Sequence, residues 1–217
     1  MSTPNLTLYL VRHGRTVYNT EHRLQGWCDS PLTPDGRAGV RVTAHDLRGR
    51  SFAAAYSSSS GRAVDTANEI LAHHPDTPLT SDDDLREFSF GDLEATHEAE
   101  LFARVDPQEM FGEVFAGTFR GLPGGEPAVV YLDRVRRGFS RIERAHEPGA
   151  EVLVVSHGVT LMAYLGMVGG RRLHPLPNAS ISTVEITPDR SRRITSLGLD
   201  PSGQGIPRSI VPASDPA

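Results

Sequence analysis

The sequence predicts an α/β domain with a mainly parallel central sheet. Short β-rich apolar runs alternate along the chain with segments of helical periodicity, as in strands joined by crossover helices. One of these runs, residues 151–156, is apolar at consecutive positions, as a strand covered on both faces is. The length of 217 residues, with 38% hydrophobic and 23% charged residues, suits one domain with a sizeable core.

Each expected element has its own local signal. Residues 6–11 are β-rich and run into Arg12-His13-Gly14, which indicates a buried strand that ends in a turn. Thr33-Pro34 is typical of a helix N-cap followed by proline at the first helical position. The expected elements are, in order, a strand at 6–11, a helix from 34 to about 47, a strand at 52–56, a helix at about 62–72, a helix bearing Leu132, Val135, Phe139 and Ile142, a strand at 151–156, and β-rich segments at 181–186 and 193–199.

The ends of the strands carry the residues of chemical interest, because ligands of parallel sheets bind at the carboxyl ends of the strands. The residues that follow the three clearest strands are Arg12, His13 and Gly14, then the serine run 57–60 with Arg62, then Ser156, His157 and Gly158. We therefore expect two histidines and two arginines to converge at one edge of the sheet.

This convergence predicts a site for a phosphate monoester. The dianion needs fixed positive charge and several donors, which Arg12 and Arg62 can supply. A neutral imidazole can attack phosphorus to give a phosphohistidine, and nearby arginines disfavour the charged form of His13. His157 can donate to the equatorial oxygens as charge develops there, and Asn19 can add a neutral donor.

The leaving oxygen needs a proton, which a carboxylic acid can supply. Candidate acids cluster in the segment Asp82-Asp83-Asp84-Leu85-Arg86-Glu87, and their spacing does not choose among them. We favour Glu87, because Phe88 and Phe90 can exclude water from its carboxyl. No His-Glu-x-x-His and no cysteine pair is present, so we expect neither a metal site nor a cofactor.

Charge and composition exclude other classes. A formal net charge of −5 is unlike that of a nucleic-acid-binding domain. All 22 basic residues are arginine, which we attribute to codon bias, so only the positions of individual arginines are informative. We find no apolar run long enough to span a membrane and no signal peptide. Cys28 is the single cysteine, which suits a reducing compartment, and we expect a cytoplasmic protein.

The motif Leu10-Val11-Arg12-His13-Gly14-Arg15-Thr16, with Asn19 after it, resembles the signature of the histidine phosphatase, or phosphoglycerate mutase-like, superfamily. Further blocks follow in the family's order: Leu24-Gln25-Gly26-Trp27, residues 30–36, Tyr56-Ser57-Ser58 with Arg62-Ala63 and Thr66-Ala67, Leu85-Arg86-Glu87 with Phe90-Gly91, and Val155-Ser156-His157-Gly158. The matches run from about residue 6 to residue 187, and their order makes the resemblance specific.

The resemblance implies a phosphoglycerate mutase-like fold, a three-layer α/β/α sandwich, and a reaction that needs no metal. It implies that His13 is the phosphorylated nucleophile and Glu87 the proton donor. Arg12, Arg62 and His157 would complete the phosphate pocket. The residues expected to bind substrate are Arg12, Gly14, Thr16, Asn19, Gly26, Arg62, His157 and Gly158.

Three departures from the family pattern concern the substrate rather than this core. Ser60-Gly61 replaces an acidic-plus-leucine pair, Gly91-Asp92-Leu93-Glu94-Ala95 replaces Gly-Leu-Glu-Gly, and Gly124-Gly125-Glu126-Pro127 replaces Gly-Gly-Glu-Ser. Residues of about 92–127 occupy the place of a lid and specificity insert. Phe111, Phe115 and Phe119 in it lie four apart, as on one helical face, where core packing is the default and a lid lining the alternative.

Three functions fit these residues. The first is a metal-independent phosphomonoester hydrolase that works through a phosphohistidine on His13. The second is a cofactor-dependent phosphoglycerate mutase, which retains a bisphosphorylated intermediate and needs extra cations. Between Phe88 and Pro127 the only basic residues are Arg104 and Arg120, and this shortage of cations favours the phosphatase. The third, a non-catalytic phosphate-binding protein, is disfavoured because the nucleophile and acid positions are both filled.

Other expectations concern organisation and partners. Residues 1–200 are expected to form a single domain, and residues 201–217, rich in Pro, Gly and Ser, a loose tail. His22, Arg23 and Arg172 are candidates to reach a substrate tail. We expect a small phosphorylated metabolite as partner, with no nucleic acid and no membrane. The sequence leaves the oligomeric state open, a homodimer included.

Overall fold

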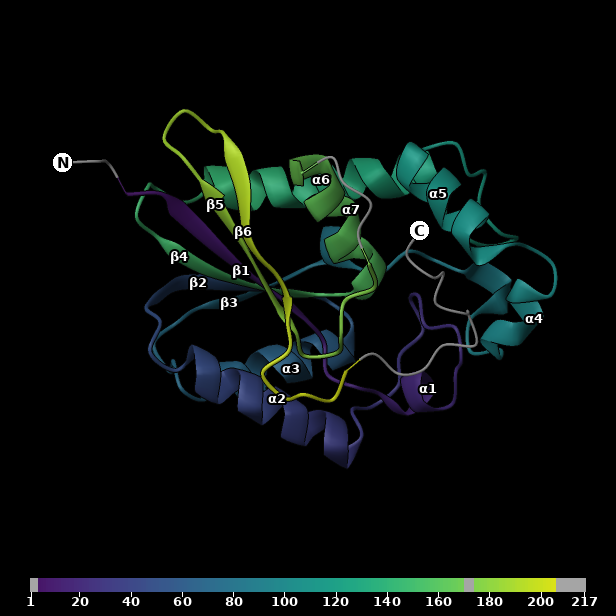
Figure 1. The fold of residues 1–217 in the computed structure, drawn as a ribbon, viewed down its shortest axis with the longest axis horizontal. Coiled ribbons are helices and arrows are strands. Elements are labelled where there is room, and N and C mark those ends of the chain that lie inside the picture. Colours follow the sequence, from purple (N-terminus) through teal and green to yellow (C-terminus); the bar gives the residue numbers. More distant parts are fainter. Residues whose placement is uncertain (1–3, 170–173, 206–217) are drawn as a thin grey trace, which may run out of the picture.

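The computed structural model describes residues 4–169 and 174–205. Figure 1 shows how the elements are arranged. In chain order they are β1 (Leu6–Arg12), α1 (Val17–Thr20), α2 (Pro34–Leu47), β2 (Phe52–Ser58), α3 (Gly61–Leu71), β3 (Leu79–Asp82), the short 3₁₀ turns η1 (Asp83–Leu85) and η2 (Gly91–Leu93), α4 (Glu98–Phe102), α5 (Pro107–Ala116), α6 (Ala128–Arg144), β4 (Glu151–Ser156), α7 (Gly158–Gly169), β5 (Ile181–Ile186) and β6 (Arg192–Leu199).

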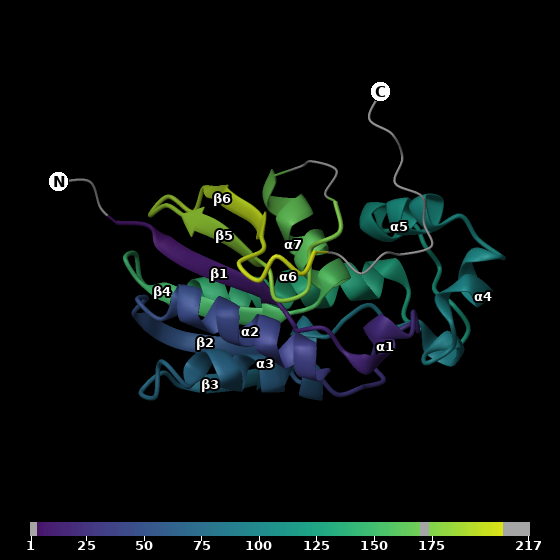
Figure 2. The same cartoon turned by 60° about the horizontal axis from the view of Figure 1, so that its bottom comes forward.

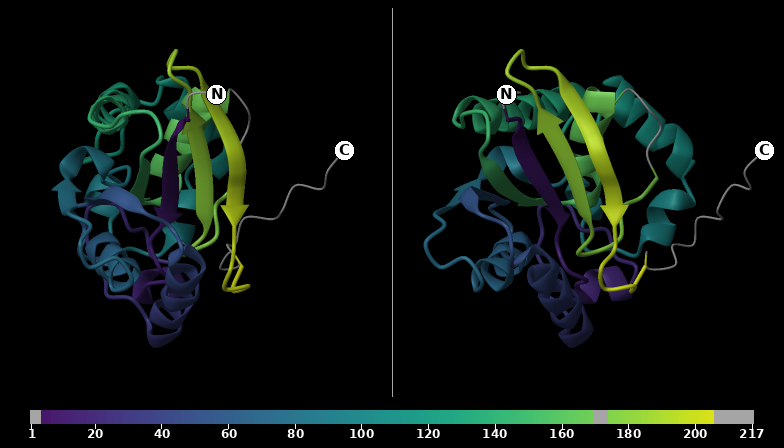
Figure 3. Two further views of the ribbon diagram at one scale, coloured as in Figure 1. Left: turned by 90° about the vertical axis from the view of Figure 1, so that its left-hand side faces the viewer. Right: turned by 60° about the vertical axis from the view of Figure 1, so that its left-hand side comes forward.

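Across the described part of the chain the strands form one six-stranded sheet in the order β3-β2-β4-β1-β5-β6. The pairs β2–β3, β2–β4 and β1–β4 are parallel, and β5 and β6 join antiparallel. Figure 3 shows β6 at one edge of the sheet, beside β5 and then β1. The expectation of a mainly parallel sheet is confirmed.

The two faces of the sheet are buried under separate helix pairs. In β4, Val152 and Val154 pack into the cluster that contains α6 and α7, whereas Leu153 and Val155 pack into the cluster of α2 and α3. Successive residues of a strand point to opposite faces, so an uninterrupted apolar run fills both layers. Figure 2 shows α2 and α3 on one side of the sheet and α6 and α7 across it. The three-layer α/β/α sandwich is confirmed.

Several predicted boundaries agree with the structure. The strands at 151–156 and 181–186 and the helix at 34–47 have the expected bounds. The hydroxyl of Thr33 accepts the main-chain N–H of Gly36, as an N-cap should. The second strand extends two residues beyond its prediction, because Ser57 and Ser58 still pair with neighbouring strands despite their polar side chains.

Other elements have no amphipathic signal. The helix α7 is apolar nearly all round, because it is packed between the sheet and α6. The short strand β3 is partly buried at its two end residues and exposed at the two between them, and it carries no apolar run.

The expectation that three phenylalanines share one helical face is wrong for the third. Helix α5 ends at Ala116, where Gly117 takes a left-handed conformation with φ of 78°. Phe111 and Phe115 stack with ring centroids 6.5 Å apart, but Phe119 lies beyond the helix end. Its ring packs against Phe88 at 6.2 Å instead, so it belongs to the core.

The segment of residues 92–127 carries α4 and α5, which lie at the end of the molecule where α1 follows β1 (Figure 1). Of the predicted tail, residues 201–205 contact α2: the amide of Gln204 donates to the carbonyl of Asp35 at 2.8 Å. The remainder, 206–217, lies outside the described residues. No helix within the described ranges is long and apolar enough to cross a bilayer.

Candidate active site

The strand order brings the predicted residues together. Arg12 is the last residue of β1, His13 follows it, and His157 lies between β4 and α7. The main-chain N–H of His13 donates to the carbonyl of Ser156 at 2.9 Å. Since β4 has β1 on one side and β2 on the other, Arg62 at the start of α3 joins the same edge.

His13 is buried, with 4% of its surface exposed. Its Nδ1 lies 2.8 Å from the carbonyl oxygen of Gly14. A carbonyl can only accept, so Nδ1 carries the proton and Nε2 presents a lone pair. Burial, followed by the charges of Arg62 and Arg12, holds the pKa of His13 well below its ordinary value. The imidazole is therefore neutral, as a nucleophile must be.

His157 is fully buried beside His13, with ring centroids 5.2 Å apart and planes at 63°. Its Nε2 lies 2.7 Å from the hydroxyl of Ser58, while its Nδ1 has no protein partner among the described residues. Burial and the charge of Arg62 hold the pKa of His157 well below its ordinary value. In the tautomer with Ser58 as donor to Nε2, the free Nδ1–H is a hydrogen-bond donor.

The two arginines are held by main-chain carbonyls. Arg62 donates through Nη2 to the carbonyl of Gly26 at 2.8 Å and through Nη1 to Cys28 and to the carboxylate of Asp29, both at 2.9 Å. Arg12 donates through Nη1 to the carbonyl of Leu176. Burial lowers the pKa of Arg12 to about 10, and this guanidinium remains charged at neutral pH.

These residues leave buried donors without acceptors. Within the described chain, buried nitrogens that lack any partner include Arg12 Nε, Gln25 Nε2, Arg62 Nε and His157 Nδ1. A buried N–H without an acceptor costs free energy, so such a set requires a ligand that accepts. The charges of Arg62 and Arg12 lower the pKa of both His13 and His157, so these four side chains lie near one another at this edge of the sheet. An oxyanion satisfies them.

Gln25 is a further candidate for the site, which the sequence-based prediction did not include. Its Oε1 accepts the hydroxyl of Thr16 at 2.7 Å, which fixes the direction of the amide and leaves Nε2 free. Its position within the motif Leu24-Gln25-Gly26-Trp27 was the available signal. The hydroxyl of Thr16 is thereby committed to Gln25, and Thr16 also caps α1.

Asn19 is oriented by another residue that was missed. Its Oδ1 accepts the main-chain N–H of Thr16 and the side-chain amide of Asn178, both at 3.2 Å. The amide nitrogen of Asn19 is therefore on the other side and is available to a ligand. Asn178 also donates to the carbonyl of His13 at 3.1 Å, so one side chain ties both residues. No local motif marks Asn178.

Glu87 is buried, with 6% exposed, at the N-terminus of α7. Its carboxylate accepts the main-chain N–H groups of Phe88, Val159 and Thr160, each at 3.0 Å. Its charge acts on Arg12, which indicates that it faces the arginines. Asp82 and Asp84 instead pair with arginines on the exposed face of α6. Glu87 is therefore the acid of this segment that the fold brings to the site.

The glycines of the predicted site have structural reasons of their own. A Cβ on Gly14 would lie 2.5 Å from Val40 Cγ2, so this glycine is needed for the packing of α2. A Cβ on Gly26 would lie 2.4 Å from a carboxylate oxygen of Glu94. A Cβ on Gly158 would lie 3.4 Å from Arg12 Nε, in ordinary van der Waals contact with the guanidinium, so glycine there leaves the backbone close to this side chain.

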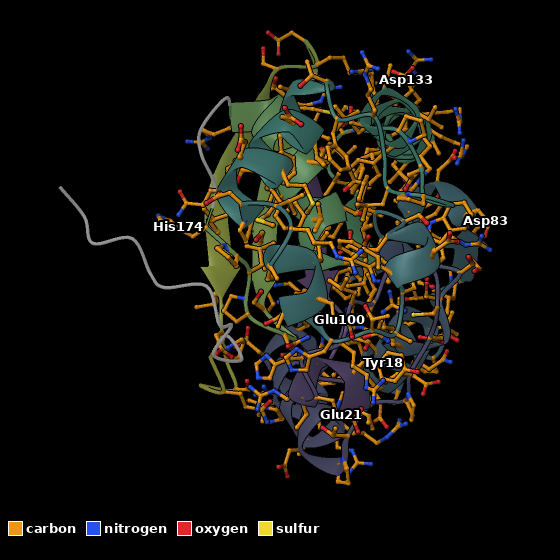
Figure 4. The ribbon with its side chains drawn as sticks, turned by 90° about the vertical axis from the view of Figure 1, so that its right-hand side faces the viewer. Tyr18, Glu21, Asp83, Glu100, Asp133 and His174 are labelled. Carbon is orange, nitrogen blue, oxygen red and sulfur yellow. The ribbon has the colours of Figure 1, made fainter. Side chains whose placement is uncertain are left out.

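The candidates for contact with a substrate tail lie on the rim. His22, with φ of 52°, places Nδ1 3.3 Å from a carboxylate oxygen of Glu98, and Arg23 donates to the carbonyl of Ala95 at 2.8 Å. Both therefore connect the loop after α1 to the segment 92–127. Figure 4 shows the end of the molecule that carries Tyr18, Glu21 and Glu100. Arg172 lies outside the described residues.

In the ranges 4–169 and 174–205, no group of three or more His, Cys, Asp or Glu side chains is placed to hold a metal ion. The free donors of the site are N–H groups of arginine, glutamine and histidine side chains. A nitrogen that carries a hydrogen cannot bind a metal ion through that position, but it can donate a hydrogen bond to an anion.

Comparison with known proteins finds relatives over most of the chain. The chain is 36% identical to the 2,3-bisphosphoglycerate-dependent phosphoglycerate mutase 2 of Gloeobacter violaceus over 162 residues. This match covers 73% of each protein. It is 35% identical over 188 residues to the probable phosphoglycerate mutase GpmB of Salmonella choleraesuis, which covers 83% of this chain and 85% of that protein.

Among solved structures, Bacillus stearothermophilus YhfR matches with a TM-score of 0.79 and 30% identity, over 89% of this chain and 97% of that one. A mycobacterial glucosyl-3-phosphoglycerate phosphatase matches with a TM-score of 0.76 and 26% identity, over 89% and 98%. The model of the histidine phosphatase superfamily (branch 1) matches residues 8–198. The relatives found in this way bear the names of phosphatases and of phosphoglycerate mutases. The chain belongs to the histidine phosphatase superfamily.

Proposed function

We propose that this protein is a metal-independent phosphomonoester hydrolase that forms a phosphohistidine on His13. The observation that supports the proposal most is the set of buried donors without acceptors around a neutral imidazole. Arg12, Arg62 and His157 would hold the non-bridging oxygens of a phosphate, and Nε2 of His13 would face the phosphorus.

In the first step, the lone pair of His13 Nε2 forms a bond to phosphorus while the bond from phosphorus to the ester oxygen breaks. Glu87 enters this step in its protonated form, and its carboxyl transfers the proton to the leaving oxygen, which departs as an alcohol. In the second step, water attacks the phosphohistidine and gives a proton back to Glu87. Inorganic phosphate leaves, and both His13 and Glu87 return to their initial states.

The charge of the segment 92–127 favours hydrolysis over phosphoryl return. This segment contains eight acidic residues, of which Glu126 is paired with Arg134 outside the segment, and two arginines, Arg104 and Arg120. A mutase must retain an intermediate with two phosphates, and repulsion from an acidic lid would oppose that. We therefore propose a small phosphomonoester as substrate. The mutase remains the second candidate, because the curated relatives at 35–36% identity bear that name.

The test uses two substrates. With 4-nitrophenyl phosphate, the protein should release phosphate, and His13→Asn should reduce the rate by at least about a thousandfold. With 3-phosphoglycerate, a phosphatase produces free phosphate, whereas a mutase produces 2-phosphoglycerate. Turnover of neither substrate, or activity that survives loss of the imidazole, would contradict the proposal.

A further inference from the structure

A second arginine system lies behind the proton-donor segment and belongs to no role assigned above. Arg134, on the inner face of α6, is 7% exposed. Its five N–H donors are all used among the described residues. Nε and Nη2 donate to the two carboxylate oxygens of Glu126, Nη1 donates to the carbonyls of Asp84 at 3.2 Å and Arg86 at 2.6 Å, and Nη2 donates to the carbonyl of Glu87 at 2.7 Å.

Glu126 binds both Arg134 and the main chain just after Glu87. It is 7% exposed, and besides Arg134 it accepts the main-chain N–H of Ser89 at 3.1 Å. The buried pair thus holds main-chain groups before, at and after Glu87. A planar guanidinium with every donor engaged fixes direction as well as distance, which a lysine cannot reproduce.

Two hydrogen bonds are made to the main chain of Glu87 itself. The carbonyl of Glu87 accepts from Arg134 and also from the indole of Trp27 at 3.1 Å. From this anchored main chain the carboxylate reaches the N–H groups of Val159 and Thr160, next to His157. A displacement of about 1 Å in a reacting group can cost about a hundredfold in rate. The position of Glu87 therefore depends on the pair.

We propose that Arg134 and Glu126 are positioning residues that hold Glu87 in line with the leaving-group oxygen. The proposal rests on the function proposed above for Glu87. A pair that only attaches α6 to the core would affect stability alone. A pair that positions the acid affects the transfer of its proton, and this effect is largest for substrates whose leaving group is a poor one.

The matched control is Glu143, a buried carboxylate on α6. This carboxylate, 3% exposed, accepts from Arg192 at the start of β6 and from the hydroxyl of Tyr164, so Glu143→Gln perturbs an ion pair whose carboxylate is buried and whose arginine is exposed. Glu143 lies in the C-terminal part of α6 and Arg192 at the start of β6, and none of the hydrogen bonds of Glu143 reaches the segment of Glu87. This variant reports the cost of a damaged ion pair that has no contact with the acid.

The experiment compares Arg134→Lys, Glu126→Gln and Glu143→Gln with the unmodified protein on 4-nitrophenyl phosphate and on an alkyl phosphate. The first two variants should lose at least about tenfold in kcat on the alkyl phosphate, with less than about threefold on the nitrophenyl ester and KM unchanged. The control Glu143→Gln should leave the ratio of kcat on the alkyl phosphate to kcat on the nitrophenyl ester unchanged. Equal losses on both substrates, or a selective loss in the control, would overturn the proposal.

A second measurement does not depend on turnover. Because the amides of Val159 and Thr160 donate to Glu87, their hydrogen exchange should be about tenfold faster in Arg134→Lys than in Glu143→Gln. Equal exchange would overturn the positioning role even if the protein released no phosphate. If single variants fail to fold, the double variant Arg134→Met with Glu126→Leu leaves no unpaired buried charge and takes their place.

Discussion

The rings of His13 and His157 meet edge to face at 5.2 Å, and each has one nitrogen fixed by a protein group of a different kind. Gly14 accepts from Nδ1 of His13, whereas Ser58 contacts Nε2 of His157. The free nitrogens are therefore Nε2 on one ring and Nδ1 on the other. One ring is suited to attack phosphorus, and the other to donate to its oxygens.

The first prediction concerns this assignment. Ser58→Ala removes the partner of His157 Nε2, so the ring can take the wrong tautomer, and kcat on an aryl phosphate should fall about 10- to 100-fold. Ser57→Ala is the matched control, since this neighbouring serine is equally buried and donates to the carbonyl of Ser58 rather than to histidine. A loss in the control as large as that in Ser58→Ala would contradict the tautomer assignment.

The second prediction concerns the proton donor. Glu87→Gln keeps the shape of the side chain but cannot transfer a proton, so hydrolysis of an alkyl phosphate should slow by about 10²- to 10⁴-fold. Hydrolysis of 4-nitrophenyl phosphate should change far less, because nitrophenolate leaves without a proton. Steady-state kinetics on both esters check this, and equal losses would indicate that another group is the acid.

The third prediction concerns pH. The pKa of His13 is lower in the folded protein than in the unfolded chain, where it is near 6.5. Below that pH the unfolded chain binds a proton that the folded protein does not, so stability falls as pH falls, until the folded-state pKa is reached. His13→Asn removes this contribution. Urea unfolding gives the free energy of unfolding at each pH between 7 and 5. Plotted against pH, this free energy should rise more steeply for the unmodified protein than for His13→Asn, by up to about 1.4 kcal/mol per pH unit. Parallel curves for the two proteins would refute the prediction.

The fourth prediction concerns Gly14. Gly14→Ala places a methyl group 2.5 Å from Val40 Cγ2 and should destabilise the fold by about 1–3 kcal/mol. Val40→Ala removes the atom that collides. In a double-mutant cycle the two changes should therefore couple favourably by about 1–2 kcal/mol. Additive effects in denaturant unfolding would show that the close approach to α2 is not the reason for glycine.

A fifth prediction is that phosphatase activity survives a chelator. The positive charge around the phosphate would come from Arg12 and Arg62, which need no ion to supply it. Dialysis against EDTA, followed by assay without added metal, should leave the rate within about twofold of the untreated protein. Loss of activity that returns with one divalent ion would defeat the prediction.

The sequence predicts those parts of the fold whose causes are local. The strand at 151–156 and the Thr33 cap follow from neighbouring residues, and both agree with the structure. The helix α7 was not predicted, because a helix that is apolar nearly all round has no amphipathic period. Phe119 has helical spacing from Phe115, but Gly117 ends the helix between them.

The candidate site divides in the same way. His13, Arg62 and His157 lie at strand ends, where the topology gathers them. Ser58 and Asn178 act through contacts across the fold, at separations of 99 and 159 residues along the chain from His157 and Asn19. Ser58 stands within the predicted block Tyr56-Ser57-Ser58, but its contact with His157 has no local signal, and Asn178 stands in no motif at all.

The placement of β4 between β1 and β2 has a consequence for biosynthesis. Arg12 and Arg62 emerge early from the ribosome, but the strand that separates and aligns β1 and β2 is made only with residues 151–156. Until then the nascent chain has both cations and no frame to hold them. The pocket is consequently formed late and cooperatively, and a fragment that stops before β4 would be inert.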